Sequence, residues 1–178
     1  MNEPSIYLAG PWVFFPNWEE IALHLKLVCE QHGAVGLFPT DAVIAPHLQG
    51  KAKAKAIFSA NVETIHRSHG IVANLSPFRG PSADSGTVWE TAYGYALGKP
   101  IAGFTTDSRT YREKLGNSST DPDGFAIEDF GLADNLMIHG GLSKANETLG
   151  EMHPDFETAL VRVLLLIQQT RKLRHRER

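Results

Sequence analysis

The sequence predicts one α/β domain in which helices cover both faces of a parallel sheet. Short apolar runs bounded by glycine and proline alternate along the chain with longer helical segments. The run GIVANL at 70–75 has no polar alternation, which is typical of a strand buried on both faces. A chain of 178 residues is long enough for one hydrophobic core. Ligands of such sheets bind at the carboxyl ends of the strands, so the loops there are expected to carry the site.

Turn residues and caps delimit the elements in the first part of the chain. Gly10 and Pro11 end the first apolar run. Asn17 and Glu20 have the spacing of a capping box at the start of a helix, and Gly33 stands just after its end. These signals predict, in order, strand 5–9, helix 17–31 and strand 34–38, which together form one βαβ unit.

The alternation continues after an irregular segment at 41–50. Gly98 and Pro100 end the helix that follows the third strand, and Pro154 suits the first turn of a closing helix. The predicted elements are helix 51–67, strand 70–75, helix 86–97, strand 100–104, short helix 111–115, strand 136–138 and helix 154–173. A five-stranded sheet is therefore expected in a domain spanning 1–170, followed by a basic, flexible tail at 171–178.

Composition narrows the class of partner. A formal net charge of −3 with 21% charged residues gives no electrostatic reason to expect nucleic acid or a membrane. The one cysteine, Cys29, excludes an internal disulfide and fits a reducing compartment. The sequence shows neither the Cys/His spacing of a metal site nor an apolar stretch long enough to span a bilayer. A cytoplasmic protein that binds small molecules without metal or cofactor is expected.

The helix after the third strand carries one carboxylate. Asp84 is a good N-cap, and Ser85 is either a second cap or a ligand contact. At about 100° per residue, Gly86, Glu90 and Gly94 share one helix face, so glycines flank the carboxylate. A mid-helix glycine costs roughly 1 kcal/mol relative to alanine, which indicates a close approach to the backbone. Either a ligand at Glu90 or the underlying sheet makes that approach.

Absent motifs narrow the chemistry further. The sequence has no GxGxxG after the first strand, no GxxxxGK[ST] and no GxSxG. Asp84 and Glu90 remain as a carboxylate pair in two different environments, and such pairs cleave glycosidic bonds. Trp12 and Phe14, in the loop after the first strand, are expected to form a stacking wall for a base or sugar. His47 is the one histidine expected near a ligand.

An ordered set of motifs resembles one family. The motifs are IYLAGP at 6–11, GIVANL at 70–75, DSGTVWE at 84–90, GYALGKP at 94–100 and DNLM at 134–137. Together they resemble the nucleoside 2-deoxyribosyltransferases over roughly residues 4–140, and an ordered set is more specific than any single motif. The resemblance implies a flavodoxin-like sheet and a homo-oligomer, based on a dimer and reaching a tetramer or hexamer, in which a neighbouring subunit completes each site.

The resemblance also implies roles for individual residues. Glu90 resembles the nucleophile that forms a glycosyl ester, and Asp84 resembles the acid that assists proton transfer at the base. Tyr7 matches a tyrosine that orients the nucleophile, although a strand tyrosine is often a core residue. Asn135 matches an asparagine that reaches the deoxyribose hydroxyl of a neighbouring subunit, or else is a turn residue. Asn61 stands where some members carry aspartate, which leaves base protonation to Asp84 or solvent.

The resemblance implies transfer of 2-deoxyribose between nucleobases, a reaction of nucleoside salvage and catabolism. The partners would be a free 2'-deoxynucleoside donor and a purine or pyrimidine acceptor, with Gly10 and Gly86 in contact with them. One alternative is hydrolysis of deoxynucleoside 5'-monophosphates, but the loop GPWVFF at 10–15 offers few donors and no cation for a phosphate. A nucleoside or nucleotide sensor without catalytic activity is a third possibility.

Overall fold

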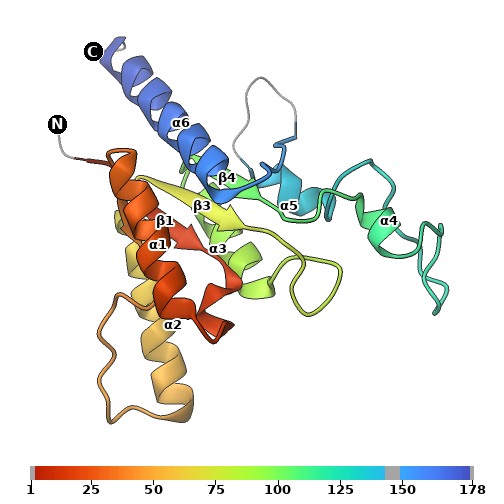
Figure 1. Ribbon diagram of the computed structural model, residues 1–178, viewed down its shortest axis with the longest axis horizontal. Coiled ribbons are helices and arrows are strands. Elements are labelled where there is room, and N and C mark those ends of the chain that lie inside the picture. Colours follow the sequence, from red (N-terminus) through yellow and green to blue (C-terminus); the bar gives the residue numbers. More distant parts are fainter. Residues whose placement is uncertain (1–2, 143–148, 177–178) are drawn as a thin grey trace.

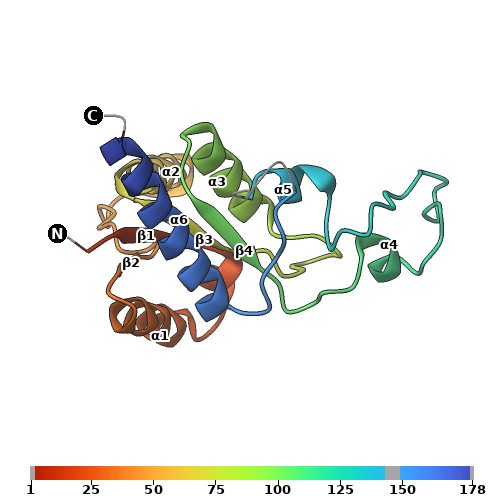
Figure 2. The same ribbon diagram turned by 90° about the horizontal axis from the view of Figure 1, so that it is seen from above.

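The computed structural model describes residues 3–142 and 149–176. Within these ranges, one parallel sheet has the strand order β2-β1-β3-β4, with β1, β3 and β4 labelled in Figure 1 and β2 in Figure 2. The strands are β1 (Ser5–Ala9), β2 (Val35–Leu37), β3 (Gly70–Asn74) and β4 (Ile101–Phe104). The helices are α1 (Trp18–Gln31), α2 (Gly50–Arg67), α3 (Ser85–Ala96), α4 (Tyr111–Lys114), α5 (Leu136–Gly140) and α6 (Phe156–Arg176), with a 3-10 turn η1 (Pro11–Phe14) after β1.

The two faces of the sheet are buried in separate hydrophobic layers. Ile6 and Leu8 of β1 pack with Val72 of β3 in the layer that contains α1 and α6. Tyr7 and Ile71 point to the opposite layer, which contains residues of α2, α3 and α5. Figure 2 shows α1 on one side of the sheet and α2 and α3 on the other. Burial on both faces explains why the strands read as continuous apolar runs.

The strand order sets the edge of the sheet at which a ligand is expected. Strand β1 lies between β2 and β3, and Ala9 at its end is in register with Ala73 of β3. The loops that follow β1 and β3 therefore leave the sheet side by side. The chain winds one way from β1 to β2 and the other way to β3, and ligands of open parallel sheets bind at this switch point.

The expected fifth strand at 136–138 is wrong, because these residues open helix α5. The Asn135 side chain caps that helix by accepting a hydrogen bond from the Met137 backbone N–H at 2.9 Å. A three-residue apolar run cannot by itself distinguish a strand from a helical turn. Beside β4, the place of a fifth strand is taken by a single parallel bridge between Phe104 and His153.

The other predicted elements are confirmed to within a few residues. The closing helix was expected over 154–173 and is α6, which begins at Phe156 and ends at Arg176. The division into a domain and a flexible tail at residue 171 stays a prediction, and residues 177–178 lie outside the described ranges. Among the helices described, none is both long and apolar enough to cross a bilayer.

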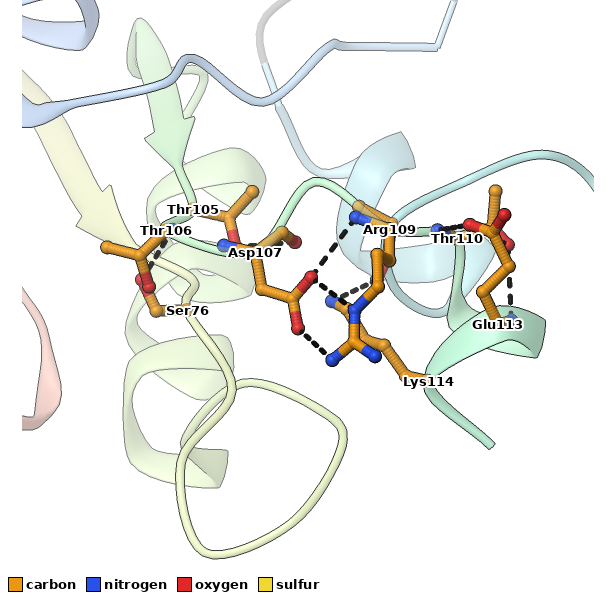
Figure 3. A network of polar contacts seen from close by, with 9 residues as sticks. Ser76, Thr105, Thr106, Asp107, Arg109, Thr110, Glu113 and Lys114 are labelled. Atoms are coloured by element: carbon orange, nitrogen blue, oxygen red, sulfur yellow. Dashed lines mark hydrogen bonds and ion pairs between the residues drawn. The ribbon is translucent and has the colours of Figure 1, made fainter. Parts of the chain in front are cut away.

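Residues 105–135 leave the sheet and project from the body with helix α4 (Figures 1 and 2). Polar contacts anchor the base of this projection (Figure 3). The Thr106 backbone N–H donates to Ser76 Oγ at 3.0 Å, which ties the segment after β4 to the loop after β3. The Lys114 ammonium donates to the carbonyl of Ala133 at 2.7 Å, which ties α4 to the segment just before α5.

Candidate active site

Glu90 is the carboxylate on which three elements converge. The Tyr7 hydroxyl, at the centre of β1, donates a hydrogen bond of 2.6 Å to Glu90 Oε1. The Asn61 amide Nδ2, from α2, lies 3.5 Å from the same oxygen. Tyr7 is fully buried, whereas Glu90 is only partly buried, so the tyrosine approaches the carboxylate from the protein side. The arrangement fixes the orientation of one carboxylate oxygen.

The surroundings of Glu90 favour its protonated form more than water does. Burial raises the pKa of Glu90 to about 7, and the nearby charge of Asp84 acts in the same direction. The hydrogen bonds from Tyr7 and Asn61 oppose that shift. Burial, followed by the charge of Glu90, raises the pKa of Tyr7, which therefore remains a hydrogen-bond donor. Near neutral pH, a substantial fraction of Glu90 is therefore ionised.

Asp84 stands at the amino end of α3, six positions before Glu90 in the sequence. Its Oδ2 accepts hydrogen bonds from the Thr87 backbone N–H at 2.9 Å and from Thr87 Oγ1 at 3.1 Å. The predicted N-cap is thus confirmed. Ser85 and Gly86 follow in the exposed first turn of α3. A Cβ on Gly86 would meet only Asp84 Oδ2, at 3.1 Å, so the surface above this turn is open.

Gly94 lies against the sheet and not beside a substrate. A Cβ at this position would come within 2.2 Å of Ile71 Cδ1, a contact that real Cβ atoms do not make. Gly94 therefore allows α3 to approach β3 closely. The idea that two glycines form a slot for the ligand is wrong at this end, and the packing alternative explains the residue.

The expected stacking wall is wrong for Trp12. This side chain is 5% exposed and belongs to the core, where it stacks on Phe38 and Phe104 at centroid distances of 6.1 and 6.2 Å. Gly10 serves the same packing, because a Cβ there would lie 2.6 Å from the Trp12 ring. Trp12 was expected to contact substrate and instead packs in the core, whereas contact of Gly10 with substrate stays a prediction.

Phe14 keeps an exposed aromatic face and belongs to a cluster that sequence reasoning missed. The side chain is 54% exposed and stacks on Phe78, from the loop after β3, at 5.6 Å. The Arg79 guanidinium lies 4.9 Å from the centroids of both rings. Arg79 also has a φ of 56°, which is strained for a residue with a side chain. The sequence did contain a signal for this cluster. Phe78 and Arg79 lie in a Pro/Gly-rich loop after β3, at the same edge of the sheet as the loop after β1 that carries Phe14.

Asn135 and Ser85 lie at a different place, a cavity of about 710 Å³ between α3 and α5. The lining is mainly apolar and includes Val88 and Met137. The Asn135 side chain is already bonded, since its Nδ2 donates to Glu128 Oε1 at 2.6 Å. Its Oδ1 is used by the α5 cap, as described above. Within one chain, Asn135 therefore does not join the group around Glu90.

His47 is exposed in the loop before α2, and within the described residues no hydrogen bond joins it to Glu90 or its neighbours. The structure thus brings together Tyr7, Asn61, Asp84 and Glu90, whereas contact of His47 with a ligand stays a prediction.

A model of one protein family, nucleoside 2-deoxyribosyltransferase, matches residues 6–137. The chain belongs to this family. A solved structure of a 2-desoxiribosyltransferase from Leishmania mexicana is 35% identical, with a TM-score of 0.74, and the match covers 93% of this chain and 97% of that one. The Schizosaccharomyces pombe protein C191.05c, itself uncharacterized, is 33% identical over 77% of this chain and 76% of its own length.

Two further structures share the fold at lower identity. A 2-deoxyribosyltransferase from Bacillus psychrosaccharolyticus is 22% identical with a TM-score of 0.53, covering 78% of this chain and 82% of that one. A conserved protein from Enterococcus faecalis is also 22% identical, with a TM-score of 0.61, covering 92% and 99%. The span matched by the deoxyribosyltransferase family model contains the whole group around Glu90 and ends inside α5, so α6 lies outside it.

Proposed function

We propose that this protein transfers 2-deoxyribose between nucleobases of free 2'-deoxynucleosides, with Glu90 as nucleophile. The observation that carries the proposal is the 2.6 Å hydrogen bond from the Tyr7 hydroxyl to Glu90 Oε1. A nucleophilic carboxylate must present a lone pair to the anomeric carbon in one orientation, and a buried phenol bonded to its other oxygen achieves this. Membership of the deoxyribosyltransferase family supports the same assignment.

The reaction then proceeds in two displacements. A lone pair of Glu90 forms a bond to C1' of the donor while the C1'–N bond breaks and leaves its electron pair on the base. Asp84, or water beside it, supplies the proton that the departing base takes up. A ring nitrogen of the second base then attacks C1' of the glycosyl ester, the C1'–O bond breaks and releases the Glu90 carboxylate, and the N–H proton of that nitrogen passes to Asp84 or to the water beside it. Two inversions give net retention of configuration.

Asn61 is well placed to read the base. Its Oδ1 is buried and has no hydrogen-bond partner among the described residues, while its Nδ2 faces Glu90. An unsatisfied buried acceptor costs roughly 1–3 kcal/mol, so a ligand donor would recover that energy. The base lies next to the bond that breaks at Glu90. We expect an N–H group of that base to donate a hydrogen bond to Asn61 Oδ1.

The pH dependence of transfer tests the role of Tyr7. Only ionised Glu90 attacks, so kcat/KM should fall tenfold for each pH unit below about pH 7, the pKa of Glu90. This fall is the acidic limb of the pH profile. The Tyr7 hydrogen bond lowers that pKa. Tyr7→Phe, which keeps the ring, should therefore move the limb upward by about one pH unit. Rates measured from pH 5 to 9 check this, and a limb that stays in place in Tyr7→Phe would contradict the orienting role.

A product assay tests the function itself. The protein is incubated with 2'-deoxyinosine and adenine, and chromatography should show 2'-deoxyadenosine formed faster than free deoxyribose. Adenosine should be a poor donor, because its 2'-hydroxyl destabilises the oxocarbenium-like transition state. Hydrolysis without any exchanged nucleoside would reject transfer in favour of N-glycosidase activity.

One observation favours hydrolysis of deoxynucleoside 5'-monophosphates as the second candidate. The loop after β1 has no cation of its own, but the fold brings Arg79 over Phe14 in that loop. Among the described residues, no carboxylate pairs with Arg79, and an arginine of this kind could bind a phosphate. If deoxyadenosine monophosphate is the fastest donor, if added base leaves the product unchanged, and if Arg79→Ala removes the preference, this candidate replaces the first.

A homo-oligomer is part of the proposal, because several large apolar side chains lie on the surface of one chain. Phe58 of α2 and Trp89 of α3 contact each other and are 54% and 45% exposed. Tyr95 and Met137, on either side of the cavity between α3 and α5, are 55% and 74% exposed. A second subunit would cover such surface. Light scattering at micromolar concentration should give a dimer or larger species, and a monomer would count against Asn135 acting in a neighbouring site.

A further inference from the structure

Asp134 is a buried carboxylate that the mechanism above does not use. It is 1% exposed and lies where the loop after β3 meets the start of α5. Its Oδ1 accepts hydrogen bonds from Ser82 Oγ at 2.6 Å and from the Asn135 backbone N–H at 2.8 Å. Its Oδ2 accepts one from the Ala83 backbone N–H at 2.8 Å. One side chain therefore joins two segments more than 50 residues apart in sequence.

These bonds require a carboxylate. All three partners are donors, and they are shared between both oxygens, so an amide in the same place would turn an N–H toward one of them. The residue before Asp134 is held as well, because the Lys114 ammonium donates a hydrogen bond to the Ala133 carbonyl. The backbone at 133–135 is thus fixed on one side by the projection and on the other by the loop before α3.

Both segments that Asp134 joins carry candidate site residues. Ala83 immediately precedes Asp84, whose charge acts on Glu90 and whose side chain caps α3. Asn135 immediately follows Asp134. We propose that Asp134 is a positioning residue: it fixes the approach of the chain to Asp84, and so holds the Asp84 carboxylate near Glu90 while it fixes Asn135 at the cavity. The catalytic consequence rests on the proposed function, but the positioning itself can be measured without any substrate.

The test is an NMR titration of Glu90 in the protein without substrate. The ¹³C chemical shift of the labelled Glu90 side-chain carboxyl is measured against pH, and the signal is assigned by its absence in Glu90→Gln. The groups that face Glu90 are Tyr7 from β1, Asn61 from α2 and Asp84 from the α3 cap. Of these, only Asp84 adjoins a residue bonded to Asp134. In Asp134→Asn the carboxylate of Asp84 gains freedom to move into solvent, so the pKa of Glu90 should fall by at least roughly 0.3 units.

Two further variants make the result specific. Ser82→Ala removes one of the three bonds and should lower the Glu90 pKa in the same direction by less. Asp107→Asn is the matched control, since this carboxylate lies on the segment after β4 and pairs with Arg109, and it should leave the titration unchanged. In the base-exchange assay, Asp134→Asn should lower kcat/KM at least about tenfold and move the acidic limb with the pKa.

The outcomes separate the possible failures. If Ser82→Ala titrates like the native protein, positioning by Asp134 is wrong, whether or not Asp134→Asn folds. An Asp134→Asn protein that is less stable but has an unchanged Glu90 titration also contradicts it, because the residue would then be merely structural. If the native protein exchanges no bases and the pKa still shifts, the proposed function fails while the positioning role stands.

Discussion

Replacing Glu90 with glutamine is expected to slow base exchange by at least about 10³-fold, because an amide cannot form the glycosyl ester. The initial rate of 2'-deoxyadenosine formation from 2'-deoxyinosine and adenine measures the loss. Asp84→Asn should lose less, since water can replace a proton donor but cannot replace the nucleophile in the same way. More than a tenth of native activity in Glu90→Gln would reject Glu90 as nucleophile.

The same variant should keep the fold, and its stability provides the control. Burial raises the pKa of Glu90 to about 7, so the ionised carboxylate destabilises the folded state. This cost is absent below the ordinary pKa of glutamate, grows as the pH rises and is complete above pH 7. Glutamine lacks this cost, so Glu90→Gln should unfold at a higher urea concentration at pH 8. The free energy of unfolding should rise by at most about 3.5 kcal/mol, at about 1.4 kcal/mol for each pKa unit between 4.5 and about 7. At pH 4 the difference should vanish.

Trp12→Ala is expected to lower the free energy of unfolding by about 3–5 kcal/mol, because it removes a large ring from the core between Phe38 and Phe104. Phe14→Ala, two residues further on, is the matched comparison. That ring is 54% exposed and should cost less than about 1 kcal/mol while weakening binding of the base or sugar. Urea unfolding of both variants measures the contribution of each ring to stability, and KM for the donor measures its contribution to binding. Together they separate the core role of Trp12 from the binding role of Phe14. Equal, small losses of stability would contradict the core position of Trp12.

Strands β1 to β4 could be predicted because burial on both faces leaves a clear mark, a continuous apolar run between breakers. The run at 136–138 carried the same mark but is a helix. Its conformation is decided by the Asn135 cap and by the Glu128 carboxylate, which accepts from the Leu136 backbone N–H at 3.0 Å. Such a contact between residues eight positions apart in an irregular segment leaves no periodic signal.

The candidate site was predictable to the extent that it depends on a local pattern. Asp84 as a cap and Glu90 on the following helix can be read from adjacent residues, and the pairing of Tyr7 with Glu90 was implied by the family resemblance. The direction in which a loop side chain points is another matter. Trp12 and Phe14 occupy the same short turn, yet one enters the core and the other faces solvent. Only the positions of Phe38, Phe78 and Phe104, distant in sequence, decide between them.

Strand β1 is hydrogen-bonded to a neighbour on each side, and this has a consequence for how the protein loses activity. Tyr7, which donates a hydrogen bond to Glu90, lies in this strand and is fully buried. Amides in such a strand exchange with solvent only when the whole domain opens. Fluctuations of the surrounding loops can admit or release ligands, but they leave the bond between Tyr7 and Glu90 in place. On heating, the orientation of the carboxylate should therefore persist until global unfolding, and the slowest-exchanging amides of the protein should include those of β1.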